Sequence, residues 1–156
     1  MPLPANPPRN PSHPFASMRA HHTGIRYPDF EKARSFWVDT MGWRVLQTWP
    51  YGELTLAYVM PPAQDDFHLE ILAGPGAVTQ PEYDDVDASL AVNGYNHVCL
   101  SVDSVDETLD ELRRRGVRIV NPPFEIDDIS ARLAFFVDPW GNMFELSEHI
   151  DGVHAH

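Results

Sequence analysis

Two parts of this chain superpose when the sequence is shifted along itself by a fixed number of positions. The shift places His22 on His97 (97 − 22 = 75) and Glu70 on Glu145 (145 − 70 = 75). In each part, a histidine is therefore followed by a glutamate at the same spacing (70 − 22 = 145 − 97 = 48). A repeat of this kind indicates that one structural unit occurs twice. Because 156 residues are too few for two ordinary domains, we expect two small, similar modules.

The elements of the second copy follow from local patterns. Residues 97–102 alternate between apolar and polar side chains, as a half-buried strand does. Ser104 starts a helix, Glu107 completes a capping box, and Gly116 ends the helix. Three more strands are expected at 116–120, 131–138 and 142–148, with a proline-containing loop at 121–130.

The first copy has the same order of elements. A strand at 22–27 precedes a helix that starts at Asp29 and ends at Gly42. Three further strands are expected at 43–49, 54–60 and 67–72. Each module is thus βαβββ, which makes the fold class α+β.

The module boundaries follow from composition. The first module covers residues 19–73, and the second covers 95–150. Residues 74–94, rich in Gly, Pro, Asp and Ala, form the linker between them. Residues 1–18 are a proline-rich tail, either disordered or packed on a partner subunit, and 151–156 are a C-terminal tail.

Composition excludes several classes of partner. The formal net charge of −12 disfavours nucleic acid and anionic membranes, which attract proteins rich in lysine and arginine. No apolar stretch approaches the length of a membrane-spanning helix. The one cysteine, Cys99, cannot form an internal disulfide. We therefore expect a cytoplasmic enzyme or a cytoplasmic binding protein.

The repeated histidines and glutamates lie on strands, where residues two apart share a face. Each of them points away from the apolar neighbours on its strand, so each module has one apolar face and one polar face. His21, next to the first histidine, is expected to face away from it. The four repeated residues are His22, Glu70, His97 and Glu145.

These four residues together indicate a metal site. Taken singly, such a histidine is more often structural, and such a glutamate more often lies on a solvated face. A buried carboxylate without a partner costs several kcal/mol or becomes protonated. Two imidazoles and two carboxylates around a divalent cation remove that cost. The sequence therefore predicts a metal site where the two polar faces meet.

Several features together resemble the vicinal oxygen chelate superfamily. They are the His-Glu-His-Glu set, the two βαβββ modules, "HTGIRYPDFEKARSFWVDTMGW" at 22–43 and the turn "DPWGNMFEL" at 138–146. That superfamily includes glyoxalase I, methylmalonyl-CoA epimerase, extradiol dioxygenases, fosfomycin-resistance enzymes and bleomycin-binding proteins. The resemblance is greatest to glyoxalase I, because the epimerase has glutamine at the second ligand position.

The resemblance implies a fold, a cofactor and an activity. The two modules would form an open, eight-stranded, barrel-like sheet, commonly with sites at a homodimer interface. His22, Glu70, His97 and Glu145 would bind one divalent ion, first zinc or nickel, with cobalt, manganese or iron as alternatives. Glu145 would act as the base in proton transfer on a substrate chelated through vicinal oxygens, with Glu70 facing it across the metal.

The substrate-binding positions match glyoxalase I only in part. Arg26 matches the arginine that binds a glutathione carboxylate, although an ion-paired arginine at the rim of the sheet is the alternative. Gly74 replaces an asparagine that also contacts glutathione. The loop at 121–130 carries Glu125, Asp127 and Asp128 instead of a basic residue, and only Arg132 could compensate. These departures argue against glutathione.

His68 and Cys99 are the remaining candidates near the site. His68 shares the face of Glu70 and either takes part in substrate binding or lines the site. Cys99 is expected to be a small wall residue. Two alternative functions stay open: an iron(II) extradiol-type dioxygenase, which uses three ligands, and a non-catalytic small-molecule binding protein of the bleomycin-resistance type.

Overall fold

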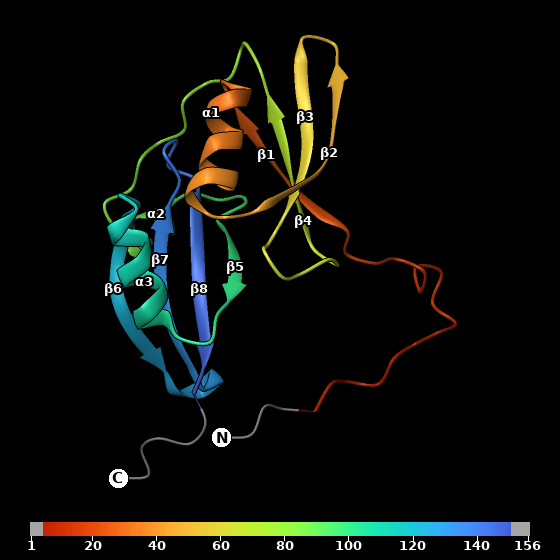
Figure 1. Ribbon diagram of the computed structural model, residues 1–156. Helices are drawn as coiled ribbons and strands as arrows, with labels where there is room; N and C mark the ends of the chain where they lie inside the picture. The colour runs from red at the N-terminus through yellow and green to blue at the C-terminus, as the bar shows by residue number, and fades with distance from the viewer. Residues whose placement is uncertain (1–4, 151–156) are drawn as a thin grey trace. The chain divides into compact units, whose positions relative to one another are not determined.

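The computed structural model describes residues 5–150 of the chain. They divide into a compact N-terminal unit, Pro7–Thr79, and a C-terminal unit that continues from Gln80. Each unit contains one four-stranded mixed sheet and one principal helix. Figure 1 labels the helix α1 with the strands of the first unit and the helix α3 with those of the second. The predicted α+β class with two βαβββ modules is confirmed. Within the described residues, the strands form two separate four-stranded sheets and do not close into a barrel.

The N-terminal unit has the strand order β1-β4-β3-β2. The first strand pairs in parallel with the last, and the other neighbours are antiparallel. Its elements are β1 (His22–Tyr27), α1 (Phe30–Ser35), η1 (Phe36–Thr40), β2 (Arg44–Tyr51), β3 (Leu54–Met60) and β4 (His68–Ala73).

The helix of the N-terminal unit differs from the expected single α-helix. It starts at the predicted cap, where the Asp29 side chain accepts a hydrogen bond from a backbone N–H. Its second half, η1, is a π-helix, in which the Met41 N–H donates to the Phe36 carbonyl (2.9 Å). The adjacent residues Phe36 and Trp37 at the start of this π-helix are both in the core. Trp37 Nε1 donates to the Tyr27 hydroxyl (3.0 Å), which satisfies its buried N–H.

The C-terminal unit repeats this arrangement with the strand order β5-β8-β7-β6. Again the first strand pairs in parallel with the last. Its elements are α2 (Val86–Ser89), β5 (His97–Ser101), α3 (Val105–Arg114), β6 (Arg118–Ile126), η2 (Asp127–Ile129), β7 (Ala131–Val137) and β8 (Met143–His149).

The expected loop at 121–130 is wrong over most of its length. Strand β6 continues through Pro122 and Pro123 to Ile126, and only η2 and Ser130 separate it from β7. Because β6 is an edge strand, its prolines need not donate to a neighbour on the open side. The pairing with β7 is irregular there, with register shifts around Asn121.

The predicted linker at 74–94 contains a short helix, α2. The Asp85 side chain caps it by accepting from the Ala88 N–H (2.8 Å). Tyr83 and Val86 pack against a buried cluster of the C-terminal sheet. The cluster consists of Phe135, Val137 and Met143. The second half of the linker is therefore part of the C-terminal unit.

The two tails lie partly or wholly outside the described residues. Residues 1–4 and the predicted C-terminal tail, 151–156, fall outside them. Residues 5–18 are almost entirely exposed and form short hydrogen-bonded turns, such as that from the Ala16 N–H to the His13 carbonyl (2.9 Å). Between residues 5 and 150, none of the helices has the length and apolar character needed to span a membrane.

Apolar and polar faces alternate as predicted. On β4, Leu69 and Ile71 are fully buried, whereas His68 and Glu70 on the opposite face are partly exposed. On β8, Phe144 and Leu146 are buried in the same way. Burial of a side chain of this size contributes about 1.5–3 kcal/mol. This burial fixes which face of each strand is left for the polar residues.

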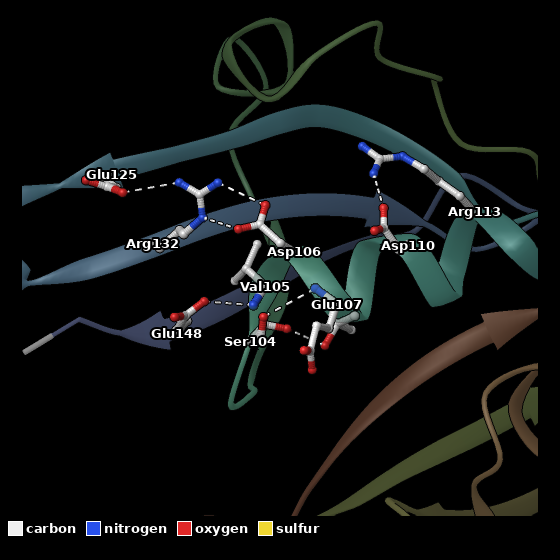
Figure 2. Close-up of polar contacts among 10 residues, drawn as sticks. Ser104, Val105, Asp106, Glu107, Asp110, Arg113, Glu125, Arg132 and Glu148 are labelled. Carbon is white, nitrogen blue, oxygen red and sulfur yellow. Dashed lines mark hydrogen bonds and ion pairs between the residues drawn. The ribbon is translucent and has the colours of Figure 1, made fainter.

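The N-terminus of α3 is satisfied by two side chains, shown in Figure 2. The predicted cap is confirmed, because the Ser104 hydroxyl accepts from the Glu107 N–H (3.3 Å). Glu148 of β8 also accepts, through Oε2, from the Val105 N–H (2.8 Å). The negative charge stabilises the positive end of the helix dipole and ties the helix to the last strand.

Arg132 on β7 links α3 to the sheet (Figure 2). Its Nε and Nη2 donate to the two carboxylate oxygens of Asp106 (3.0 and 2.9 Å), and its Nη1 donates to Glu125 on β6 (3.2 Å). The hydrogen bond from Arg132 is the main cause that lowers the pKa of the Asp106 carboxyl. A two-point contact of this kind is the strongest geometry for an arginine–carboxylate pair.

We predict that Asp106→Asn destabilises the protein at pH 7 and that the effect disappears in acid. Because the pKa of Asp106 is lowered from 3.8 in the folded state, its contribution is present above that value and is lost as pH falls through the folded pKa. Urea unfolding midpoints measured from pH 7 to pH 3 test this. The control is Asp110→Asn, which removes an exposed carboxylate paired with Arg113 on the same helix. Equal effects of both variants at every pH would contradict the prediction.

Candidate metal centre

The parallel pairing of the first and last strand brings histidine and glutamate together in each unit. On β1 and β4, Gly24 lies opposite Glu70. On β5 and β8, Cys99 lies opposite Glu145. In both units the glutamate therefore faces the residue two positions after the histidine, and strand alternation puts its side chain on the histidine's face. The histidine and the glutamate therefore have the same relative positions in both units.

The atoms that face each other are the same in both pairs. His22 Nε2 lies 3.3 Å from Glu70 Oε2, and His97 Nε2 lies 2.9 Å from Glu145 Oε2. The glutamate side chains are only 14% and 15% exposed, whereas those of the histidines are about twice as open. Each largely buried carboxylate thus has an imidazole as its partner, which offsets the loss of solvation.

The donor atoms of each histidine–glutamate pair are of kinds that bind divalent ions. A neutral imidazole nitrogen and an ionised carboxylate are both lone-pair donors, so a separation of about 3 Å requires a proton or a cation between them. Imidazole with carboxylate suits zinc, nickel, cobalt, manganese and iron(II). Among residues 5–150, no group of three or more histidine, cysteine, aspartate or glutamate side chains gathers closely enough to hold an ion. Each unit supplies a pair of candidate ligands.

The surroundings of the two glutamates differ at one repeat position. Beside Glu70 the position is Gly24, where an added Cβ would lie 3.5 Å from Glu70 Oε2 and 3.0 Å from Leu72. Beside Glu145 it is Cys99, whose Sγ lies 3.4 Å from Glu145 Oε1. Partial burial raises the pKa of the Cys99 thiol to about 12, and the charge of Glu145 and the hydrogen bond to it add to the shift. Cys99 is therefore a thiol donor to the carboxylate.

The residue before each histidine also contacts it, which sequence reasoning missed. Asn96 Oδ1 lies 2.8 Å from His97 Nδ1, and His21 Nδ1 lies 2.8 Å from His22 Nδ1. The expectation that His21 faces away from His22 is therefore wrong: its ring reaches back to its neighbour. The signal was present, because the repeat shift also places position 21 on position 96 (96 − 21 = 75).

Aromatic rings surround both histidines. The Tyr58 ring lies 5.2 Å from that of His22 and 4.7 Å from that of Trp49, measured between centroids. The Phe135 ring lies 5.3 Å from the His97 ring, edge to face. Tyr58 and Phe135 lie opposite the two glutamates on the neighbouring strands. Around Tyr58 and Phe135 those strands carry apolar residues on both faces, so alternation did not reveal either residue.

His68 lies on the predicted face, directly opposite His22 in the strand register. Its ring is 5.5 Å from that of His21 and 5.6 Å from that of Tyr58. Within the described part of the chain, its buried Nδ1 has no hydrogen-bond partner. A substrate-binding role for His68 stays a prediction.

Arg26 is bound to backbone carbonyls at the end of β4. Its Nη1 donates to the carbonyls of Tyr27 and Leu72, and its Nη2 donates to those of Gly74 (2.9 Å) and Pro75 (2.6 Å). The guanidinium therefore fixes the start of the linker. Its predicted contact with a substrate carboxylate stays a prediction and requires that the substrate displace some of these bonds.

Two further positions were compared with substrate-binding residues of glyoxalase I in the sequence, and neither has a free polar side chain. Arg132 is engaged with Asp106 and Glu125. At Gly74, φ is +152°, and an added Cβ would lie 2.9 Å from the Glu53 carbonyl oxygen and 2.8 Å from a methyl group of Leu54. The backbone there leaves no room for the asparagine that glyoxalase I has at this position.

Comparison with known proteins places the chain in a family. The model of the Glyoxalase/Bleomycin resistance protein/Dioxygenase superfamily matches residues 19–146. A probable lactoylglutathione lyase of Synechocystis is 30% identical over 128 residues, which are 80% of this chain and 91% of the relative. The lactoylglutathione lyase of Salmonella typhimurium is 28% identical over 137 residues, 86% and 95% of the two chains.

Solved structures agree with this result. A glyoxalase family protein from Enterococcus faecalis is 23% identical, covers 83% of this chain and 97% of its own, and has a TM-score of 0.68. The trypanothione-dependent glyoxalase I of Leishmania major is 25% identical, with coverage of 85% and 87% and a TM-score of 0.61. The chain belongs to the glyoxalase, bleomycin resistance and dioxygenase superfamily, which confirms the resemblance stated from its motifs.

We predict that Arg26→Met lowers the free energy of unfolding by about 1 kcal/mol, because partly buried backbone carbonyls at the end of β4 lose their donors. A typical hydrogen bond contributes about that much to stability. Denaturant unfolding measures the change. Arg34→Met, at an exposed position on α1, is the control and should be neutral. Unchanged stability of Arg26→Met would show that these bonds do not hold the start of the linker.

Proposed function

We propose that the protein is a metal-dependent lyase or isomerase of the glyoxalase I type, which transfers a proton on a small substrate chelated through vicinal oxygens. The observation that carries the proposal is the pair of His–Glu contacts, 3.3 and 2.9 Å, built in the same way in both units. The relatives named lactoylglutathione lyase support the reaction class.

His22, Glu70, His97 and Glu145 are the proposed ligands of one divalent ion. Zinc or nickel is the first choice, and cobalt, manganese and iron are the alternatives. The bound ion supplies Lewis acidity, which polarises the substrate carbonyl and stabilises the charge that develops when the adjacent carbon loses a proton. We also propose that the protein is a cytoplasmic homodimer. The two histidine–glutamate pairs that bind one ion come either from one chain or from two chains.

Glu145 is the proposed base. Its Oε2 faces His97, whereas its Oε1 contacts the thiol of Cys99, which is a weak donor. Because a weak donor is readily displaced, Oε1 is the oxygen more available to take a proton from a substrate. Glu70 is the second proposed carboxylate, and Gly24 lies opposite it in the strand register.

We propose that the substrate is an adduct of a thiol other than glutathione, or a compound that contains no thiol. Arg26 and Arg132 have their guanidinium groups engaged within the protein. Gly74 has no room for an amide side chain, and Glu125 adds negative charge beside Arg132. A tripeptide with two carboxylates would find few free cationic partners among these residues.

Metal content and ligand variants test the proposal. Purified protein should contain one divalent ion per chain by mass spectrometry. His97→Ala and Glu145→Gln should each lower turnover, and Glu145→Gln should do so by about 10²–10⁴-fold because a general base is lost. Circular dichroism checks that both fold, and His13→Ala, at an exposed histidine, is the control. Full turnover in both variants would reject the assignment.

The substrate is tested with hemithioacetals of methylglyoxal, each assayed with zinc, nickel, cobalt and manganese in turn. We expect glutathione to be a poor thiol, with a higher KM than an uncharged thiol such as 2-mercaptoethanol, because the cationic anchors are engaged. Efficient turnover with glutathione would overturn this expectation but keep the reaction class. Oxygen uptake with catechols would favour the dioxygenase alternative, and tight ligand binding without metal would favour a binding protein.

A further inference from the structure

A chain of hydrogen bonds runs from helix α2 to His97. The Ser89 hydroxyl donates to the Val86 carbonyl (2.6 Å), with a longer contact to Met143 Sδ (4.0 Å). Asn96 Nδ2 donates to Ser89 Oγ (3.0 Å), and Asn96 Oδ1 lies 2.8 Å from His97 Nδ1. Ser89 is 2% exposed, so its polar atom depends on these partners rather than on water.

The direction of every bond in this chain is set by its first acceptor. The Val86 carbonyl can only accept, so Ser89 uses its single hydrogen there and must accept from Asn96. Only the amide nitrogen of Asn96 can donate, which turns Oδ1 toward His97. An amide oxygen only accepts, so His97 must carry its hydrogen on Nδ1. The other ring nitrogen, Nε2, is then the one that faces Glu145, 2.9 Å from its Oε2.

In the first unit, the residue before the histidine also contacts its Nδ1, but the direction of that hydrogen bond is not fixed. His21 occupies the equivalent position and lies 2.8 Å from His22 Nδ1. Its ring is exposed and can donate or accept there, according to its tautomer. Among the described residues, the Ser89–Asn96 chain therefore has no equivalent in the first unit that sets the direction of the bond.

We propose that Asn96, oriented by Ser89, is a positioning residue that fixes the tautomer and the ring orientation of His97. The inference rests on the proposed function only in assigning His97 as a metal ligand. It gives the segment predicted as a linker a role at the site, because α2 carries the group that sets the direction of the hydrogen bonds. Partners of this kind typically change metal affinity by about 10–100-fold.

Metal affinity in a set of variants tests the inference. Zinc binding to the full chain is measured by competition with a chromophoric chelator. Asn96→Ala should weaken it by about 10–100-fold, whereas Asn96→Asp, which still accepts from His97 Nδ1, should stay within about threefold of the wild type. The matched control is Asn93→Ala, at an exposed position three residues earlier. Equal affinity of Asn96→Ala and Asn93→Ala would overturn the inference.

The dependence on Ser89 is tested by a double-mutant cycle. Ser89→Ala should weaken zinc binding less than Asn96→Ala, and the double variant should bind as Asn96→Ala does, because Ser89 acts only through Asn96. Additive losses would show that Ser89 acts by another route. Unfolding midpoints of all variants separate loss of affinity from loss of fold.

Nitrogen-15 NMR of histidine in the metal-free protein separates this inference from the proposed function. The wild type should show a hydrogen on His97 Nδ1, and Asn96→Ala should lose its protection from exchange. If the wild type binds no zinc but shows this hydrogen, the proposed function fails and the positioning contact stands. If His97 Nδ1 carries no hydrogen in the wild type, the inference fails regardless of metal binding.

Discussion

In each unit, the first strand pairs in parallel with the last, and the site depends on this pairing. The register places a glutamate opposite the residue two positions after a histidine, although the two residues lie far apart along the chain. The apolar residues on the other face of the same strands are buried, which prevents a one-residue slip that would turn the glutamate into the core. The packing of the core therefore also fixes the position of the glutamate relative to the histidine.

The two units share this frame but differ in the residues around it. Beside one glutamate is Gly24, where an added Cβ would lie 3.0 Å from Leu72, and beside the other is Cys99, which donates a hydrogen bond. Behind one histidine is the exposed His21, and behind the other is Asn96, held by a buried serine. The histidine of the second unit therefore has the more constrained hydrogen-bond partner.

Local sequence patterns predicted the structure correctly where the side chains of the segment itself determine it. Ser104 caps its helix, and the alternation on β4 and β8 gives the correct buried face. The patterns failed where a neighbour outweighs local preference. Strand β6 continues through two prolines because it lies at an edge, and α2 forms within the predicted linker because Tyr83 and Val86 find apolar partners. The sequence of neither segment contains information on the strand or the apolar cluster that it packs against.

The sequence by itself determined the repeat, the α+β class and the two His–Glu pairs, because the repeat shift and period-two alternation are properties of the chain alone. The superfamily followed from the resemblance of its motifs to known proteins. Only the tertiary structure decided which polar groups are already engaged. Arg26 binds backbone carbonyls, Arg132 binds two carboxylates and Asn96 binds its neighbouring histidine. Hydrogen-bond partners depend on distances of about 3 Å between side chains and backbone brought together by folding, and no spacing along the chain encodes them.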